Sequence, residues 1–426
     1  MTSPSELPIR PAEDPRTEVG TKFDVGGVLL DQPFKIRRLG HVGINMDSQE
    51  EGLHFYRELL GFRIADVRDD FSNAAMDLPD QFRDGSDLTA YFLRHGADHH
   101  SLAMYHHRVR EYTDRFDRWR EDITVNQISW QVGSVDEVVH GWQWMRDQGQ
   151  NLSRWGRDMP GSNWHCYLMD PDWFQNEIYY GTEQIGWWRR TKPAEMHDND
   201  WKQQYPDRPV FSEERELLET EAAGIDLGAG RIDIDDFPER YDVQGVVLPR
   251  PFKVERVGPV GLFVENLEAS VDFYTNALGF DITEEVDFGG HRCVYLRCNT
   301  DHHSVALFPI EVRALVGLSD HTRLATLGLR VANYDQLRAA VDFLGEHGVR
   351  FREFPAELHP GIDYGVVALD PSNHAILLYH QMEQIGWDGK PRPAELRPKV
   401  QPGAWPEYVE GQVDSYLGEP FLGPWG

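Results

Sequence analysis

The sequence predicts an α+β protein made of four βαβββ modules, which are paired into two homologous halves. Two observations support this prediction. An internal repeat covers most of the chain, and each half contains the same strand and helix pattern twice. A third observation concerns function: a set of metal-ligand side chains present in the first half is missing from the second.

The internal repeat keeps its order along the chain while its offset shortens slightly. Four pairs of segments define it: Phe23-Asp-Val-Gly-Gly-Val-Leu-Leu-Asp-Gln-Pro-Phe-Lys35 with Tyr241-Asp-Val-Gln-Gly-Val-Val-Leu-Pro-Arg-Pro-Phe-Lys253 (offset 218), His54-Phe-Tyr-Arg-Glu-Leu-Leu-Gly-Phe62 with Asp272-Phe-Tyr-Thr-Asn-Ala-Leu-Gly-Phe280 (offset 218), Asp98-His-His-Ser-Leu-Ala103 with Asp301-His-His-Ser-Val-Ala306 (offset 203), and Glu183-Gln-Ile-Gly-Trp187 with Glu383-Gln-Ile-Gly-Trp387 (offset 200). Residues at equivalent positions are called repeat counterparts below.

Composition restricts the partners and the cellular location. A chain of 426 residues with a formal net charge of −29 is a poor match for nucleic acid or an anionic membrane surface. Its three cysteines form no CxxC pair and are expected to be buried, reduced thiols. The first residues have no basic and apolar leader pattern, and no apolar run reaches membrane length, so we expect a cytoplasmic protein.

The elements of the first half follow from alternation, capping boxes and turn residues. In chain order we expect a strand over residues 38–46, a helix from the capping box Ser48/Glu51 to Gly61, strands near 63–67, 88–94 and 100–107, a strand over 124–132, a helix from the capping box Ser134/Glu137 to about 148, and further strands that end at 180. The second half repeats this series.

Residues 167–180 end the first half with two strands and a tight turn. Asp170-Pro171 is typical of such a turn, because proline fixes φ and aspartate bonds to the backbone beyond it. Alternation then places Glu177 and Tyr179 on the same face of the second strand. A carboxylate among apolar and aromatic residues is costly to bury unless it is paired or binds a metal.

The repeat also sets the expected domain limits. The divisions are an N-terminal arm over 1–36, a metal-bearing domain over 37–187, a charged and proline-rich linker over 188–250, a second domain without a metal over 251–387, and a C-terminal arm over 388–426.

The paired modules, the openings Leu39-Gly-His-Val-Gly-Ile44 and Val257-Gly-Pro-Val-Gly-Leu262, and the Asp-Pro turn seven residues before Glu177 together resemble the vicinal oxygen chelate superfamily. The four-module chain is similar to the type I extradiol ring-cleavage dioxygenases of that superfamily, which have a glyoxalase fold. The resemblance covers residues 37–187 and 254–387. It implies an eight-stranded open cup in each half.

The resemblance also implies a divalent metal in the cup, held from three strands. Carried over to this sequence, the ligand positions are His41, Gln127 and Glu177. The family usually has histidine where Gln127 stands; a glutamine binds through its amide oxygen, or else lies behind a metal-bound water. We expect Fe(II), with Mn(II) or another hard divalent ion such as Mg(II) as the alternative.

The second half gives an independent test of these three positions. The repeat counterparts of His41, Gln127 and Glu177 are Pro259, Thr326 and Leu377, so the whole set is lost while the surrounding scaffold is retained. The sequence therefore predicts one metal, in the first half.

The resemblance implies further site residues. His100 matches an acid–base histidine that takes a proton from the substrate hydroxyl, although His303 stands at its place in the second half. Tyr167 matches a tyrosine near the metal, and its counterpart is Val367. We expect His165, Tyr179, Trp130 and Asp158 to contribute to substrate binding, with core packing as the competing interpretation of the aromatic residues.

Three functions follow from these residues. The first is a metal-dependent extradiol dioxygenase that cleaves a catechol-like aromatic substrate with O2 in aromatic catabolism. The second is a non-oxidative metalloenzyme of the same superfamily, an isomerase or lyase, in which the metal acts as a Lewis acid. The third is a protein that binds an aromatic compound between residues such as Trp164 and Trp173 without turnover. We expect a homo-oligomer in each case.

Overall fold

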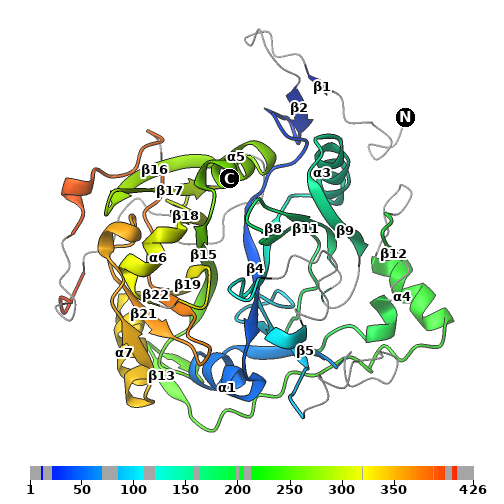
Figure 1. The fold of residues 1–426 in the computed structure, drawn as a ribbon. Coiled ribbons are helices and arrows are strands. Elements are labelled where there is room, and N and C mark those ends of the chain that lie inside the picture. The colour runs from blue at the N-terminus through cyan, green and yellow to red at the C-terminus, as the bar shows by residue number, and fades with distance from the viewer. Residues whose placement is uncertain are drawn as a thin grey trace.

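The structure is a computed structural model that describes residues 11–12, 22–69, 85–109, 120–157, 161, 163–197, 201–205, 213–318, 320–386, 388–398 and 405–409. Two large mixed sheets, one from each half, form its body (Figure 1). The predicted α+β class and the two homologous halves are confirmed.

The first half forms a nine-stranded sheet. Its strands are β4 (Arg38–Met46), β5 (Arg63–Arg68), β6 (Ala90–Arg94), β7 (Leu102–His106), β8 (Val125–Gln131), β9 (Asn151–Arg157), β10 (Trp164–Met169), β11 (Gln175–Tyr180) and β12 (Trp201–Lys202). They are ordered β12-β9-β10-β11-β8-β4-β7-β6-β5. Eight strands were expected, and the ninth is β12, a short strand of the linker that pairs with the edge strand β9.

The second half forms an eight-stranded sheet of the same design. Its strands are β15 (Val254–Val264), β16 (Asp281–Phe288), β17 (His291–Arg297), β18 (Val305–Pro309), β19 (Leu324–Val331), β20 (Arg350–Arg352), β21 (Gly365–Leu369) and β22 (Ala375–Tyr379), in the order β16-β17-β18-β15-β19-β22-β21-β20. Smaller sheets contain β1 (Pro11–Ala12), β2 (Lys22–Val25), β3 (Val28–Leu30), β13 (Tyr241–Val243) and β14 (Val246–Leu248).

Helices connect the strands of each module. They are α1 (Gln49–Leu53) with its π-helical continuation η2 (His54–Leu59), α3 (Val135–Asp147), α4 (Glu213–Ala222), α5 (Leu267–Asp272) with η5 (Phe273–Ala277), α6 (Ile310–Val316), α7 (Tyr334–Glu346) and the 3-10 turns η4 (Ala194–His197), η6 (Ala356–Leu358) and η7 (Ala394–Leu396). Ser48 caps the N-terminus of α1, where it accepts from the Glu51 amide at 3.3 Å, and Ser134 caps that of α3, where it accepts from the Glu137 amide at 3.2 Å.

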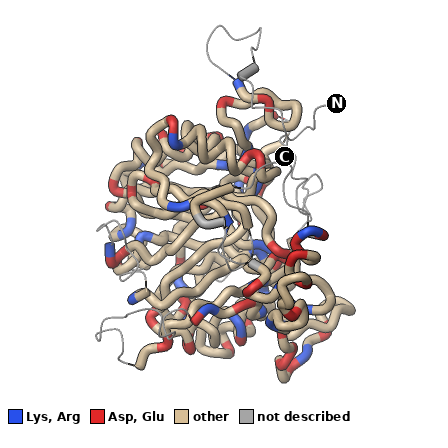
Figure 2. The backbone as a smooth tube through the Cα atoms, turned by 90° about the vertical axis from the view of Figure 1, so that its right-hand side faces the viewer, with Lys and Arg blue, Asp and Glu red and all other residues tan. Residues whose placement is uncertain are grey.

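In the part of the chain that the structure describes, no helix has the length and apolar character needed to cross a membrane. The three cysteines are free and buried, as predicted. Figure 2 shows acidic positions interspersed with basic ones along the backbone, so the net negative charge is distributed over the fold.

The strand registers of the two sheets match at most of the paired positions. One position differs, because His41 pairs with Ser129, whereas the β15–β19 ladder has a register shift between Val257 and Val260. Gly43 is opposite Gln127 where β4 meets β8, and Gly261 is opposite Thr326 where β15 meets β19. In the same way β11 pairs with β8, and β22 pairs with β19. The repeat counterparts assigned from the sequence are therefore spatial counterparts as well.

The two halves pack together through side chains exchanged between their modules. The Tyr56 hydroxyl donates to the Asp370 carboxylate at 2.9 Å, and the Tyr274 hydroxyl donates to the Asp170 carboxylate at 3.3 Å. Between these contacts, the Trp130 and Phe280 rings meet edge to face at 5.0 Å. Each half thus inserts one tyrosine into the Asp-Pro turn of the other, and β4 lies beside β15 (Figure 1).

Candidate metal centre

Three adjacent strands at the centre of the first sheet carry a row of buried polar side chains. His41 on β4 is opposite Ser129 on β8, and Ser129 is opposite Glu177 on β11. Residues paired in this way point to the same face of a sheet. His41 Nε2 lies 2.9 Å from Glu177 Oε2, and both side chains are at most 1% exposed.

Gln127 joins this row from the same face of β8, two residues before Ser129. Its amide nitrogen lies 3.5 Å from Glu177 Oε2 and 3.4 Å from the Ser129 hydroxyl. The structure therefore brings together the three side chains that the resemblance identified as ligands, although they come from positions far apart in the chain.

Two further residues hold the Glu177 carboxylate, and sequence reasoning missed both. The Ser129 hydroxyl donates to Oε2, and the Asn163 side-chain amide donates to Oε1 at 2.8 Å. Their repeat counterparts are Gly328 and Asp363. Both residues change along with the ligands, so the same repeat comparison could have found them.

These contacts keep the Glu177 carboxylate charged. Burial alone raises the pKa of Glu177, but the charges of His41 and His165 and the hydrogen bonds from His41 and Ser129 outweigh burial and lower the pKa to about 2. The group is therefore an anion at neutral pH, with no exposure to solvent.

The donor set fits a divalent cation that accepts one nitrogen and two oxygen ligands. His41 offers an imidazole nitrogen, Glu177 a carboxylate oxygen, and Gln127 an amide oxygen once its amide is turned. Because the third donor is an amide, no group of three His, Cys, Asp or Glu side chains among the described residues is arranged to hold a metal. The second nitrogen of His41, Nδ1, is buried and has no partner among these residues.

His100 lies against His41, with ring centroids 4.3 Å apart, and its Nδ1 is 3.1 Å from Nδ1 of His99. Burial, together with the charges of His41 and His99, lowers the pKa of His100 well below its usual value, so the ring is neutral at pH 7. The second half keeps the same arrangement, because the Nδ1 atoms of His302 and His303 are also 3.1 Å apart. The histidine pair is therefore a feature of the scaffold that the first half places beside His41.

Tyr167 and His165 lie on β10, next to Glu177. Tyr167 is directly opposite Glu177 in the β10–β11 ladder, and the His165 ring meets the Tyr167 ring edge to face at 4.8 Å. His165 Nδ1 lies 3.8 Å from Glu177 Oε1, and the Arg154 guanidinium stacks over the Tyr167 ring at 4.2 Å. Both aromatic residues are therefore close to the carboxylate.

The remaining predicted site residues have different outcomes. The Tyr179 ring lies 4.9 Å from the His41 ring and packs against Gly40, where an added Cβ would lie 1.7 Å from the tyrosine oxygen. Trp130 is on the opposite face of β8, where it donates to Asn176 at 2.8 Å and belongs to the core between the halves, so it does not line the site. Strand alternation explains this, because residues an odd number of positions apart point to opposite faces of a strand, and Trp130 is three residues from Gln127.

The fourth predicted substrate-binding residue, Asp158, lies outside the described residues.

The profile of the family described as Glyoxalase/Bleomycin resistance protein/Dioxygenase superfamily matches residues 38–178 and 256–378. Metapyrocatechase 2 from Cupriavidus necator is 29% identical over 150 residues, which are 34% of this chain and only 38% of that protein's length.

Solved structures show the same fold at low sequence identity. The 2,3-dioxygenase LapB from Pseudomonas sp. KL28 is 16% identical with a TM-score of 0.51, covering 84% of this chain and 96% of its own. The anaerobic complex of homoprotocatechuate 2,3-dioxygenase from Brevibacterium fuscum with 3,4-dihydroxyphenylacetate is 14% identical with a TM-score of 0.51, covering 84% of both chains.

Proposed function

This chain belongs to the glyoxalase/bleomycin resistance protein/dioxygenase superfamily, and on that premise we propose that it is a metal-dependent extradiol-type dioxygenase. Its substrate would be an aromatic compound with two vicinal hydroxyl groups, and O2 would be the second substrate. The observation that carries the proposal is the buried convergence of His41, Gln127 and Glu177 in the first half. The ring-cleaving relatives support the choice of reaction.

A divalent metal, with Fe(II) preferred and Mn(II) as the alternative, would be held by His41, Glu177 and the amide oxygen of Gln127. When bound, such a metal supplies chelation of the two substrate oxygens and access to O2 chemistry. Glu177 contributes the anionic ligand, and Coulomb attraction to its charge exceeds that to a neutral amide. Ser129 and Asn163 fix both carboxylate oxygens, so the carboxylate keeps one orientation.

The chain also has groups suited to handling protons and the substrate ring. His100 is neutral at pH 7, since burial lowers its pKa, so its ring could accept a proton from a substrate hydroxyl. Tyr167 and His165 lie on the other side of Glu177 from His41, where they would contact the substrate or the ligand carboxylate. Tyr179 holds the backbone at Gly40, next to His41.

Gln127 supports a second candidate function. An amide oxygen is a harder and weaker ligand than imidazole. A glutamine in place of the usual histidine therefore shifts the metal preference toward Mn(II) or Mg(II). A non-oxidative isomerase or lyase of the same superfamily would use such a metal as a Lewis acid and would consume no O2.

One experiment separates these functions. The full chain is purified without oxygen, loaded with Fe(II), Mn(II) or Mg(II), analysed for metal, and assayed in an oxygen electrode with catechols and hydroquinones. We expect one metal per chain and O2 uptake with an aromatic vicinal diol, both lost in Glu177→Gln. Turnover without O2 uptake would establish the second function. A chain that binds aromatic compounds equally well with and without Glu177 would be a binding protein.

A further inference from the structure

The linker between the two halves carries four large apolar side chains that face solvent. Trp187 is 99% exposed and Trp188 is 90% exposed, and Ile232 and Ile234 are exposed as well. Single exposed apolar residues are ordinary on a protein surface, whereas a group of them marks a contact surface. The four residues come from two stretches of the linker that are distant in sequence.

Backbone pairing holds these two stretches side by side. Arg190 is paired with Ile232 in an antiparallel bridge, and the Thr191 amide donates to the Arg231 carbonyl at 2.9 Å. The bridge brings the two tryptophans next to the two isoleucines, and the arginines on both stretches are exposed. We call this surface the linker patch; its residues are Trp187, Trp188, Arg190, Arg231, Ile232 and Ile234.

The second stretch of the patch has its apolar residues on the outside. It reads Arg-Ile-Asp-Ile-Asp-Asp over residues 231–236. Asp233, between the two isoleucines, is buried and lies 2.7 Å from the Arg94 guanidinium of the first half. The carboxylate therefore faces the protein while Ile232 and Ile234 face solvent, which reverses the usual arrangement. Covering two isoleucines is favourable, so this pattern favours a partner.

The second half has the same turn without the apolar surface. The amides of Arg189 and Gly389 each donate to the glycine carbonyl three residues earlier, at 3.0 and 3.1 Å, and both residues have a positive φ, of 54° and 66°. Glycine suits this left-handed conformation, whereas arginine is strained in it. The preceding residue is Trp188 in the first half and Asp388 in the second. The turn that the repeat preserves therefore does not require the exposed tryptophan.

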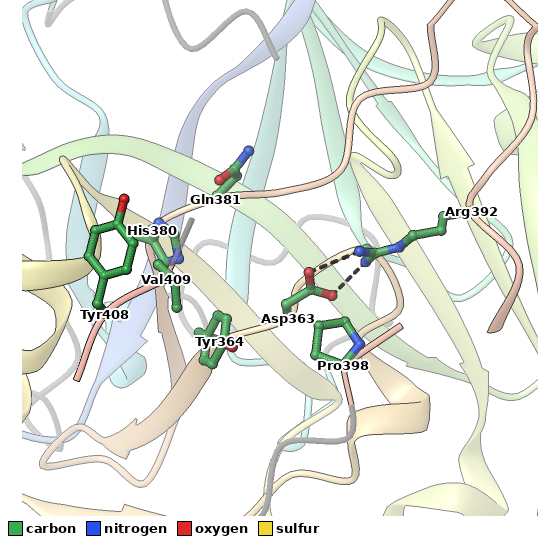
Figure 3. A pocket seen from close by; sticks show the side chains of 9 residues that line it. Asp363, Tyr364, His380, Gln381, Arg392, Pro398, Tyr408 and Val409 are labelled. Carbon is green, nitrogen blue, oxygen red and sulfur yellow. Dashed lines mark hydrogen bonds and ion pairs between the residues drawn. The ribbon is translucent and has the colours of Figure 1, made fainter. Parts of the chain in front are cut away.

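The segment that follows the second half also packs on its own half. Arg392 forms a two-bond ion pair with Asp363, at 2.6 and 3.1 Å. Further along this segment, Tyr408 lies beside His380 (Figure 3). The corresponding segment after the first half turns its tryptophans away from the protein instead. The linker patch is therefore particular to the connection between the halves.

Helix α4 of the same linker offers a complementary surface. Its Glu216 lies 2.7 Å from the Arg157 guanidinium and 3.2 Å from the Lys192 ammonium group, so the helix is anchored close to the linker patch. On the side away from these contacts, Leu217 and Leu218 are exposed. The other exposed side chains around them are acidic except for Arg215: Glu214, Glu219 and Glu221.

Area and charge both favour a second copy of the chain as the partner. Burial of a tryptophan removes roughly 150–250 Å² from water. Two of them would supply about half of the roughly 800 Å² that each partner contributes to a standard interface. A second copy has the same net charge of −29, so exposed Arg190 and Arg231 are suited to meet it. Tryptophan and arginine are also the residues that contribute most to such interfaces.

We propose that the linker patch is a dimer interface, which docks on the outer face of α4 in a second copy of this chain. A two-fold axis would form the contact twice, with the patch of each copy on α4 of the other. The tryptophans would pack on Leu217 and Leu218, and the patch arginines would face the glutamates of the helix. This proposal does not depend on the reaction proposed for the metal centre.

The test is analytical ultracentrifugation of the full chain from micromolar to submillimolar concentration. We expect a dimer with twice the mass of the chain. The double variants Trp187→Ser/Trp188→Ser and Leu217→Ser/Leu218→Ser should each raise the dimer dissociation constant about a hundredfold or more, because a two-fold dimer loses the contacts of both copies. Glu221→Lys reverses a charge on α4 and should raise the constant several-fold.

The control is Val246→Ser/Val247→Ser, which removes an exposed apolar pair from β14 and should leave the dissociation constant unchanged. A monomer at every concentration would overturn the proposal, as would a tryptophan variant that dimerises like the unmodified chain. A dimer weakened by the tryptophan changes but not by the α4 changes would also contradict it, since the partner surface would then lie elsewhere. A monomer that sediments with anionic phospholipid vesicles through its tryptophans would instead assign the patch to a membrane.

Discussion

Glu177 and Leu377 occupy the same register in two sheets of the same design, opposite Ser129 and Gly328 respectively. Around Glu177 the structure has hydrogen-bond donors and an imidazole, whereas Leu377 belongs to an apolar core cluster. The same sheet design therefore accommodates polar side chains on its inner face in the first half and apolar ones in the second. The polar interior satisfies its buried charge through specific partners, and the apolar one needs none.

The apolar interior of the second half extends well beyond the ligand positions. Phe263 and Phe308 pack at 5.9 Å in the cluster that contains Leu377, and they stand where the first half has Asn45 and Tyr105. Burial of these rings stabilises the second half directly. The fold therefore does not require the polar cluster, which supports a functional reason for keeping it in the first half.

The largest effect on this comparison is expected from Glu177→Ala. Removal of the one anionic ligand should abolish binding of a divalent metal, because His41 and Gln127 would supply no negative charge to hold it. Elemental analysis after loading checks this. Leu377→Ala is the matched control, which should lose stability through its cavity but keep the metal. Unchanged metal content in Glu177→Ala would place the metal elsewhere.

Leu377→Glu introduces a carboxylate at the equivalent place in the second half. There it is packed among the apolar side chains of the Leu377 cluster, so the free energy of unfolding should fall by about 3 kcal/mol or more. Thermal or urea unfolding measures the loss. The mutated group should be protonated at neutral pH, so the loss should shrink as the pH falls. Leu377→Met, which keeps volume and polarity, should cost less than about 1.5 kcal/mol.

Asn163→Ala removes the donor to Glu177 Oε1. Loss of a hydrogen bond to a buried charged group should lower the free energy of unfolding by about 1.5–3 kcal/mol and weaken metal affinity about tenfold or more. A metal titration together with urea unfolding tests both effects. Asn45→Ala is the control, because Asn45 accepts from Asn126 rather than holding the carboxylate. Equal metal affinity in the two variants would show that Asn163 has no positioning role.

Gln127→His should raise Fe(II) occupancy several-fold, because imidazole binds this ion more strongly than an amide oxygen does. Turnover of the native substrate should fall if the glutamine also positions that substrate. Metal analysis and an oxygen-electrode assay are made side by side. Thr326→His makes the same change in the second half and should gain no iron, since Leu377 supplies no carboxylate. Unchanged iron in Gln127→His would place residue 127 outside direct contact with the metal.

The sequence by itself determined the module pattern and the two halves, and with the family resemblance it predicted which residues would be the metal ligands. Alternation decides which side chains of a strand share a face, and the repeat offset decides which positions correspond. For this reason the sequence alone pairs His41, Gln127 and Glu177 with second-half residues that do not form a metal-ligand set. The ladders of the two sheets agree with this pairing where both contain the residues, as for Gln127 and Thr326.

Only the tertiary structure decided which side chains hold the carboxylate and where the aromatic residues lie. Ser129 and Asn163 reach Glu177 through the ladder between β8 and β11 and through the loop before β10, and neither arrangement follows from local periodicity. Trp130 was expected at the site but packs between the halves, since its face of β8 meets Phe280 of the second half. Such contacts join residues distant in sequence, and their geometry is fixed by packing between whole sheets rather than by any single segment.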